Sequence, residues 1–133
     1  MFLRVDHIGI AVNSLSEATR LFSTLFGHSP EKTEMVADQD VYLALYAIGD
    51  SQIELVEPTT SNSPIGEYLR KRGGGIHHLC LEVDDIHQEL ARLKTAGMQL
   101  IDETPRPGAE GTLIAFIHPK ATSGVLIELL QRM

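Results

Sequence analysis

The sequence predicts an α+β domain built from two copies of one β-α-β-β-β module. The first observation is an internal repeat, in which strand, helix cap, helix and glycine follow in the same order in VDHIGIAVNSLSEATRLFSTLFG (5–27) and IHHLCLEVDDIHQELARLKTAG (76–97). The second is composition, since 43% hydrophobic and 22% charged residues over 133 positions are typical of one globular domain. We expect a single domain over 1–133, with module one at about 4–58, a linker at about 59–75 and module two at about 76–131.

The two predicted helices have similar ends. A side chain that can cap a helix N-terminus is followed three residues later by Glu or Gln, and a glycine suited to the left-handed conformation stands after each helix. Between these ends, apolar residues recur at helical spacing, which predicts that one face of each helix packs on a sheet. The apolar positions are Leu15, Ala18, Phe22 and Leu25 in the first helix and Ile86, Leu90, Leu93 and Ala96 in the second.

Short runs with strand character follow each helix and are separated by polar residues or glycine. They predict three strands per module, at 29–36, 40–47 and 51–57 in the first and at 98–103, 111–117 and 124–130 in the second. The linker combines turn-forming residues with a proline that can start a short helix over about 64–72.

Composition argues against several classes of protein. Eleven Lys and Arg against 18 Asp and Glu give a formal charge of −7, which repels phosphate backbones and anionic lipid, so no nucleic acid and no membrane is expected as a partner. Cys80 is the single cysteine, which excludes an internal disulfide. Because the sequence shows no secretory signal pattern and no apolar run of about 20 residues, a cytoplasmic location is expected.

Four side chains are candidate metal ligands. Strand alternation places His7 on a face with two small residues, which leaves room for a ligand, and His78 holds the equivalent position in module two. The last strand of each module carries a carboxylate among apolar residues, Glu54 and Glu128. An ionised carboxylate in such surroundings is costly unless another group or an ion pairs with it.

The spacing from histidine to glutamate is similar in the two modules, 47 residues (54 − 7) and 50 residues (128 − 78). If the modules meet about a pseudo-two-fold axis, two imidazoles and two carboxylates converge on one cavity, a ligand set suited to divalent Mn, Co, Ni, Zn or Fe rather than calcium. A lone histidine on a strand is more often structural than ligating, but repetition of the pair favours a site. We interpret the remaining histidines as surface or supporting residues and Cys80 as part of a pocket wall, and we expect Glu82 either to line the cavity or to lie in solvent.

Three motifs extend this interpretation across nearly the whole chain. They are DHIGIAV (6–12), SPIGEYLRKRGGGIHHLCLEVDDI (63–86) and HPKATSGVLIELLQ (118–131). In order and spacing they resemble the vicinal oxygen chelate (glyoxalase/bleomycin resistance) superfamily and, within it, the epimerase family that acts on methylmalonyl-CoA. The resemblance implies a half-open, cup-shaped mixed sheet with helices on its outer face, one divalent metal ion, an acyl-CoA substrate and a homodimer. It also implies that His7, His78 and Glu128 are metal ligands and that Glu54 is a fourth ligand or a water-mediated one.

The activity that the resemblance implies is interconversion of the 2R and 2S forms of methylmalonyl-CoA through an enolate that a divalent ion stabilises. Glu128 is the first candidate base. Glu54 is the candidate for the second catalytic carboxylate, because the strand at 40–48 has none in its interior. Four cations are candidate contacts for the CoA portion: Arg70, Lys71, Arg72 and Lys120.

Two alternatives stay open. A glyoxalase-I-like lactoylglutathione lyase also uses His and Glu ligands and an enediolate, so ligand types alone do not separate it from the epimerase. A non-catalytic module that binds a small molecule without metal is disfavoured, because such a module has no need of four ligand-type residues on one cavity.

Overall fold

The computed structural model describes residues 1–133, apart from the side chain of Asp38. The chain forms two compact units, Met1–Asp6 with His78–Met133, and His7–His77. Strands β1 (Phe2–Ala11) and β5 (Gly75–Val83) each contribute residues to both units. The unit boundary therefore falls beside the candidate ligands His7 and His78.

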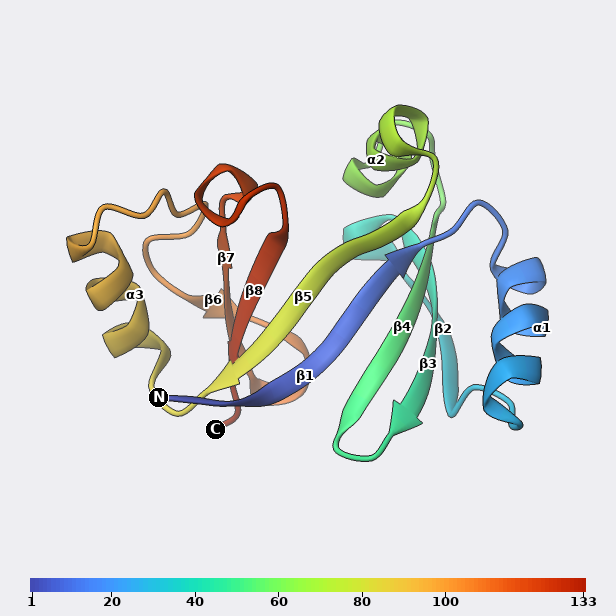
Figure 1. Cartoon of the computed structure of the whole chain (residues 1–133), viewed down its shortest axis with the longest axis horizontal. Helices are drawn as coiled ribbons and strands as arrows, with labels where there is room; N and C mark the ends of the chain where they lie inside the picture. Colours follow the sequence, from blue (N-terminus) through green and yellow to red (C-terminus); the bar gives the residue numbers. More distant parts are fainter. The chain divides into compact units, whose positions relative to one another are not determined.

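The unit His7–His77 contains the elements predicted for module one and for the linker helix. After the second part of β1 they are α1 (Leu15–Phe26), β2 (Lys32–Val36), the 3₁₀ turn η1 (Ala37–Gln39), β3 (Val41–Ile48), β4 (Ser51–Pro58) and α2 (Pro64–Arg72). The strands lie in the order β2-β3-β4-β1, with β4 parallel to β1 and the other neighbours antiparallel (Figure 1).

The unit that holds residues 78–133 has the same plan. After β5 its elements are α3 (Ile86–Thr95), β6 (Arg106–Pro107), the 3₁₀ turn η2 (Ala109–Gly111), β7 (Leu113–Ile117), the 3₁₀ turn η3 (Pro119–Thr122) and β8 (Leu126–Gln131). The strand order is β5-β8-β7-β6, and β8 is parallel to β5 (Figure 1). The predicted α+β class is confirmed, with mixed pairing over eight strands and three α-helices among the described residues.

The strand registers confirm the internal repeat. Gly9 pairs with Glu54 between β1 and β4, and Cys80 pairs with Glu128 between β5 and β8. The offset between equivalent residues is 71 on the first strand (80 − 9) and 74 on the last (128 − 54). Each candidate carboxylate therefore occupies the same place relative to the histidine-bearing strand of its own module.

Helix caps form as the sequence predicts. Ser14 Oγ accepts a hydrogen bond from the Glu17 amide at 3.2 Å, and Asp85 Oδ1 accepts one from the Gln88 amide at 3.1 Å. Gly27 ends α1 in the left-handed conformation, with φ of 80°. Helix α3 ends at Thr95, and its C-cap is Ala96 rather than the predicted Gly97.

Helix α1 packs on its own sheet with one correction to the predicted face. Ala18 of α1 is buried in one cluster with sheet residues Ala44, Tyr46 and Leu55. Phe26 lies edge-on to Tyr46 with ring centroids 5.0 Å apart, whereas Leu25 is 71% exposed. The predicted burial of Leu25 is therefore wrong, because the last turn of the helix buries the aromatic neighbour in its place.

The strand predicted at 98–103 is also wrong. Only an isolated bridge between Leu100 and Ile117 forms there, and the short β6 lies further along the chain. The amides of Ile101 and Asp102 both donate to the Phe116 carbonyl, while the Phe116 amide donates to Asp102 Oδ2 at 2.8 Å. The Asp102 carboxylate thus takes the place of a backbone acceptor, which interrupts the ladder.

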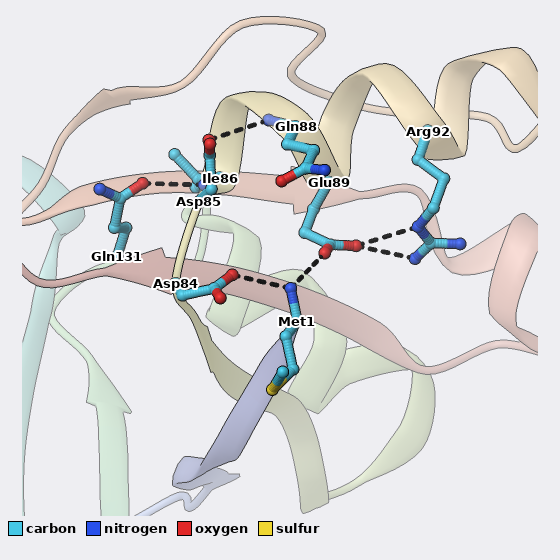
Figure 2. A network of polar contacts seen from close by, with 8 residues as sticks. All are labelled: Met1, Asp84, Asp85, Ile86, Gln88, Glu89, Arg92 and Gln131. Atoms are coloured by element: carbon cyan, nitrogen blue, oxygen red, sulfur yellow. Dashed lines mark hydrogen bonds and ion pairs between the residues drawn. The ribbon is translucent and has the colours of Figure 1, made fainter.

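Polar contacts tie the start of β1 to α3 within one unit (Figure 2). The Met1 amino group lies 2.7 Å from Asp84 Oδ1 and 2.7 Å from Glu89 Oε2. Two hydrogen bonds from Arg92 also reach Glu89, a residue only 6% exposed. The amino group and Arg92 hold the pKa of the Glu89 carboxyl below its ordinary value of 4.5.

Among the described residues, no helix combines the length and the apolar character needed to cross a membrane.

Candidate metal centre

One unit brings two candidate ligands together. His7 lies on β1 and pairs with Gln52 of the parallel strand β4, and Glu54 lies two residues beyond Gln52, so both side chains project from one face. His7 Nε2 lies 3.8 Å from Glu54 Oε2, and the two side chains are 12% and 18% exposed. Two metal–ligand bonds of about 2.1 Å each span at most about 4.2 Å, so both atoms can contact one ion.

Neither of the residues that pair with Glu54 on the adjacent strands carries a carboxylate. Gly9 pairs with Glu54 on one side, and Leu45 of β3 pairs with it on the other. Gly9 therefore adds no side chain beside the carboxylate. The prediction that the interior of the third strand supplies no carboxylate is confirmed for β3, Val41–Ile48.

The other unit places His78 and Glu128 in the equivalent arrangement. His78 pairs with Leu126, and Glu128 pairs with Cys80, so the glutamate again lies two pairs further along a parallel ladder. Glu128 is 9% exposed and Cys80 is fully buried. Phe116 of β7 pairs with Glu128 on its other side. The carboxylate is therefore enclosed by a thiol and an aromatic residue, a setting that disfavours an isolated charge.

Imidazole nitrogen and carboxylate oxygen in both units fit a borderline to hard divalent ion. The histidine and the glutamate of each module lie on neighbouring parallel strands, and the registers give them the same relation in both units. A shared ion held by all four residues remains a prediction.

The predicted CoA contacts on α2 are partly engaged by their own helix. Arg70 Nη2 lies 3.6 Å from Glu67 Oε1, and the Arg72 guanidinium lies 5.8 Å from the centre of the Tyr68 ring. Lys71, between them, is exposed. Lys120 belongs to the other unit, where it is exposed in η3 and its amide donates to His118 Nδ1 at 3.0 Å.

His77, one of the histidines interpreted as surface or supporting residues, is half-buried. Its ring meets Tyr68 edge-on, with centroids 5.0 Å apart. Burial lowers the pKa of the His77 imidazole from its ordinary value of 6.5, because the charged form loses hydration. This histidine is accordingly suited to a neutral, structural role.

Sequence reasoning missed a cluster of four charges in the unit that holds residues 1–6 and 78–133. Arg132 lies 2.7 Å from Asp6 and 3.0 Å from Glu82, and Arg4 lies 3.1 Å and 2.7 Å from the same two carboxylates. Glu82, with its side chain 13% exposed, is therefore paired with two arginines and does not lie in solvent. Arg4 and Asp6 stand two residues apart and therefore share one face of β1, which is the sequence signal for this cluster.

The comparisons with known proteins agree with this fold. The model of the glyoxalase/bleomycin resistance protein/dioxygenase superfamily matches residues 6–116, and the chain belongs to this superfamily. Several of its relatives are epimerases. The ethylmalonyl-CoA/methylmalonyl-CoA epimerase of Cereibacter sphaeroides is 36% identical over 98% of this chain and 99% of its own length. The uncharacterized protein YqjC of Bacillus subtilis is 41% identical over 96% of this chain and 91% of its own length.

A solved structure extends the likeness to three dimensions. A variant of Streptomyces coelicolor methylmalonyl-CoA epimerase, in complex with 2-nitronate-propionyl-CoA, superposes with a TM-score of 0.89 at 33% identity. The match covers 99% of this chain and 96% of that one. The predicted resemblance to this superfamily and to its methylmalonyl-CoA epimerases is therefore confirmed. The superfamily usually binds a divalent metal ion.

Proposed function

We propose that this chain interconverts the 2R and 2S forms of methylmalonyl-CoA. The observation that carries the proposal is full-length similarity to epimerases together with a His–Glu pair at equivalent places in both modules. The substrate has a hydrogen on the carbon between a thioester carbonyl and a carboxylate. Removing that hydrogen as a proton leaves an enolate, and returning a proton to the opposite face inverts the centre.

His7, Glu54, His78 and Glu128 would hold one divalent ion, with Co, Mn, Ni or Zn as the candidates. When bound, the ion would supply positive charge to the two substrate oxygens and stabilise the enolate. These four residues would hold the ion while leaving the substrate's carbonyl and carboxylate oxygens access to its charge.

Glu128 is the proposed base. Its burial beside Cys80 and opposite Phe116 keeps water from the carboxylate, which favours proton transfer to and from carbon. Glu54 is the proposed second acid–base group, because it is the equivalent carboxylate of module one. One of them takes the proton from C2, the other returns a proton to the opposite face, and no other reagent is consumed.

The acyl-CoA would be bound by the cations Arg70, Lys71, Arg72 and Lys120. Of these, Lys71 and Lys120 are exposed, and Arg70 is 57% exposed despite its contact with Glu67. The acidic chain, at a formal charge of −7, makes local cations necessary for a phosphate-bearing ligand. A single α+β domain over 1–133, a homodimer and a cytoplasmic location complete the proposal.

Isotope exchange tests this function. Purified protein with (2S)-methylmalonyl-CoA in deuterated water should introduce deuterium at C2 faster than buffer alone, and the 2R isomer should accumulate. Treatment with a chelator should stop the exchange, and added Co²⁺ or Mn²⁺ should restore it.

The two alternatives give different results in the same preparation. Turnover of the hemithioacetal of methylglyoxal and glutathione, without deuterium exchange, would establish the lyase. Binding of an acyl-CoA without exchange and without metal would establish the non-catalytic module. Ethylmalonyl-CoA, which the Cereibacter sphaeroides relative is named for, measures how far the acyl pocket tolerates a longer side chain.

A further inference from the structure

In each module a side chain from the last strand caps the first residue of the helix. Glu57 Oε1, at the end of β4, accepts a hydrogen bond from the Leu15 amide at 2.6 Å. Gln131 Oε1, at the end of β8, accepts one from the Ile86 amide at 2.8 Å (Figure 2). Leu15 and Ile86 begin α1 and α3, where the first amides have no acceptor within the helix. Both contacts therefore join a strand end to a helix start inside one unit.

These contacts are additional to the ordinary caps. Ser14 and Asp85 accept from the third helical amide, as described above, whereas Glu57 and Gln131 accept from the first. Only the second kind of contact connects the helix to a strand. Its loss releases the strand end, while loss of an ordinary cap affects the helix alone.

The two strand residues keep a constant distance in sequence from the candidate ligands. Glu57 stands three residues after Glu54, and Gln131 stands three residues after Glu128. Successive side chains of a strand point to opposite faces, so an offset of three places the cap on the face opposite the ligand. A strand that is held to its helix on one face is restrained in twist and in position on the other.

The two modules place the negative charge at the helix N-terminus on different residues. In module one the strand residue Glu57 is charged and the N-cap Ser14 is neutral, whereas in module two Gln131 is neutral and Asp85 is charged. Each helix N-terminus thus receives one carboxylate from this pair of positions, as its dipole favours. The feature common to both strand residues is the acceptor oxygen that joins strand to helix, since only one of them is charged.

We propose that Glu57 and Gln131 are positioning residues for the metal centre, which hold β4 and β8 so that Glu54 and Glu128 keep the geometry of ligands. This inference rests on the proposed function, because it requires that these glutamates bind an ion. Residues that orient metal ligands from outside typically contribute 10- to 100-fold to affinity, and we expect the lower end here because the effect passes along a strand, about 10-fold.

The test measures metal affinity directly and needs no substrate. Full-length protein is stripped with a chelator, and Co²⁺ alone is titrated in by calorimetry at a temperature where circular dichroism shows every variant folded. Glu57→Leu and Gln131→Leu remove the acceptor from one strand each. Ser14→Ala and Asp85→Ala are matched controls, since they remove a cap from the same helices and leave the strands attached.

The expected result separates the two kinds of cap. Glu57→Leu and Gln131→Leu weaken Co²⁺ binding about 10-fold each, whereas Ser14→Ala and Asp85→Ala change it less than about 2-fold while lowering the melting temperature. Glu57→Gln and Gln131→Glu, which exchange the residues of the two modules, keep affinity near that of the original chain. In the metal-free protein, amide exchange at Leu15 and Ile86 is faster in the leucine variants.

Other outcomes overturn the inference. Unchanged Co²⁺ affinity in both leucine variants, or equal weakening by Ser14→Ala, shows that the strand contacts do not position the ligands. If Glu57→Leu does not fold, Gln131→Leu carries the test in the other unit. An original chain that binds no Co²⁺ refutes the proposed metal centre, which is a result distinct from a centre that binds normally without the strand contacts.

Discussion

Replacing Arg132 should destabilise the fold by more than its exposure suggests. Arg132 is 46% exposed, but it is bonded to two carboxylates, Asp6 at 2.7 Å and Glu82 at 3.0 Å, whose side chains are 9% and 13% exposed. A hydrogen bond to a charged group contributes about 1.5–3 kcal/mol when buried, and an exposed ion pair about 0.2–1 kcal/mol. Because Arg132 is partly exposed and its carboxylate partners are nearly buried, we expect its contribution to lie between these two values.

We expect Arg132→Met to lower the free energy of unfolding by about 2 kcal/mol. For a chain of this length that is a fall in melting temperature of roughly 8 °C. The loss is limited because Arg4 continues to contact both carboxylates. Urea unfolding of Arg132→Met, Asp6→Asn and the double variant isolates the pair, with an expected coupling of about 1.5 kcal/mol.

A surface pair of similar length is the control. Lys94 Nζ lies 2.6 Å from Glu103 Oε1, but both side chains are more than 60% exposed. Lys94→Met should therefore cost less than about 0.5 kcal/mol. A coupling between Asp6 and Arg132 as small as the Lys94 effect would refute the argument that burial of the carboxylates strengthens these bonds.

The remaining predictions concern catalysis and pH. Glu128→Gln should reduce deuterium exchange about 1,000-fold while circular dichroism stays unchanged, and near-normal exchange would remove Glu128 from the role of base. Because the pKa of Glu89 is lowered in the folded state, its stabilisation is present above pH 4.5 and is lost as pH falls through its folded pKa. Glu89→Gln should accordingly be less stable than the original chain at pH 7, with the gap closing as pH falls below 4.5 in urea unfolding; a constant gap would contradict this. The His77 ring should titrate below 6.5 by NMR, and its burial should reduce stability as pH falls below 6.5; an NMR value at or above 6.5 would contradict that.

Local patterns were sufficient for much of the fold. The linker helix at Pro64–Arg72 and the caps at Ser14 and Asp85 form as predicted. Proline fixes its own backbone angle at the first helical position, and serine and aspartate accept from amides three residues further on. Strand alternation also placed His7 with Gly9 and Ala11 on one face of its strand. Interactions of this range can be deduced from sequence order alone.

The predictions that were wrong depend on contacts between residues far apart in the sequence. The strand predicted at 98–103 is interrupted because the Asp102 carboxylate meets the Phe116 amide 14 residues away. The alternative that Glu82 lies in solvent is wrong because its partners, Arg4 and Arg132, are 78 and 50 residues away. Such pairs are invisible to periodicity, which records only the face of an element on which a residue lies.

The sequence by itself determined the duplicated module, the order of its elements and the histidine and glutamate that each copy contributes, since repetition and alternation are properties of residue order. Only the tertiary structure decided which strands pair in parallel, which carboxylates are neutralised by arginine, and that Glu57 and Gln131 join strand ends to helix starts. The physical reason is that hydrogen bonds and ion pairs act over about 3–4 Å in space, whatever the separation along the chain.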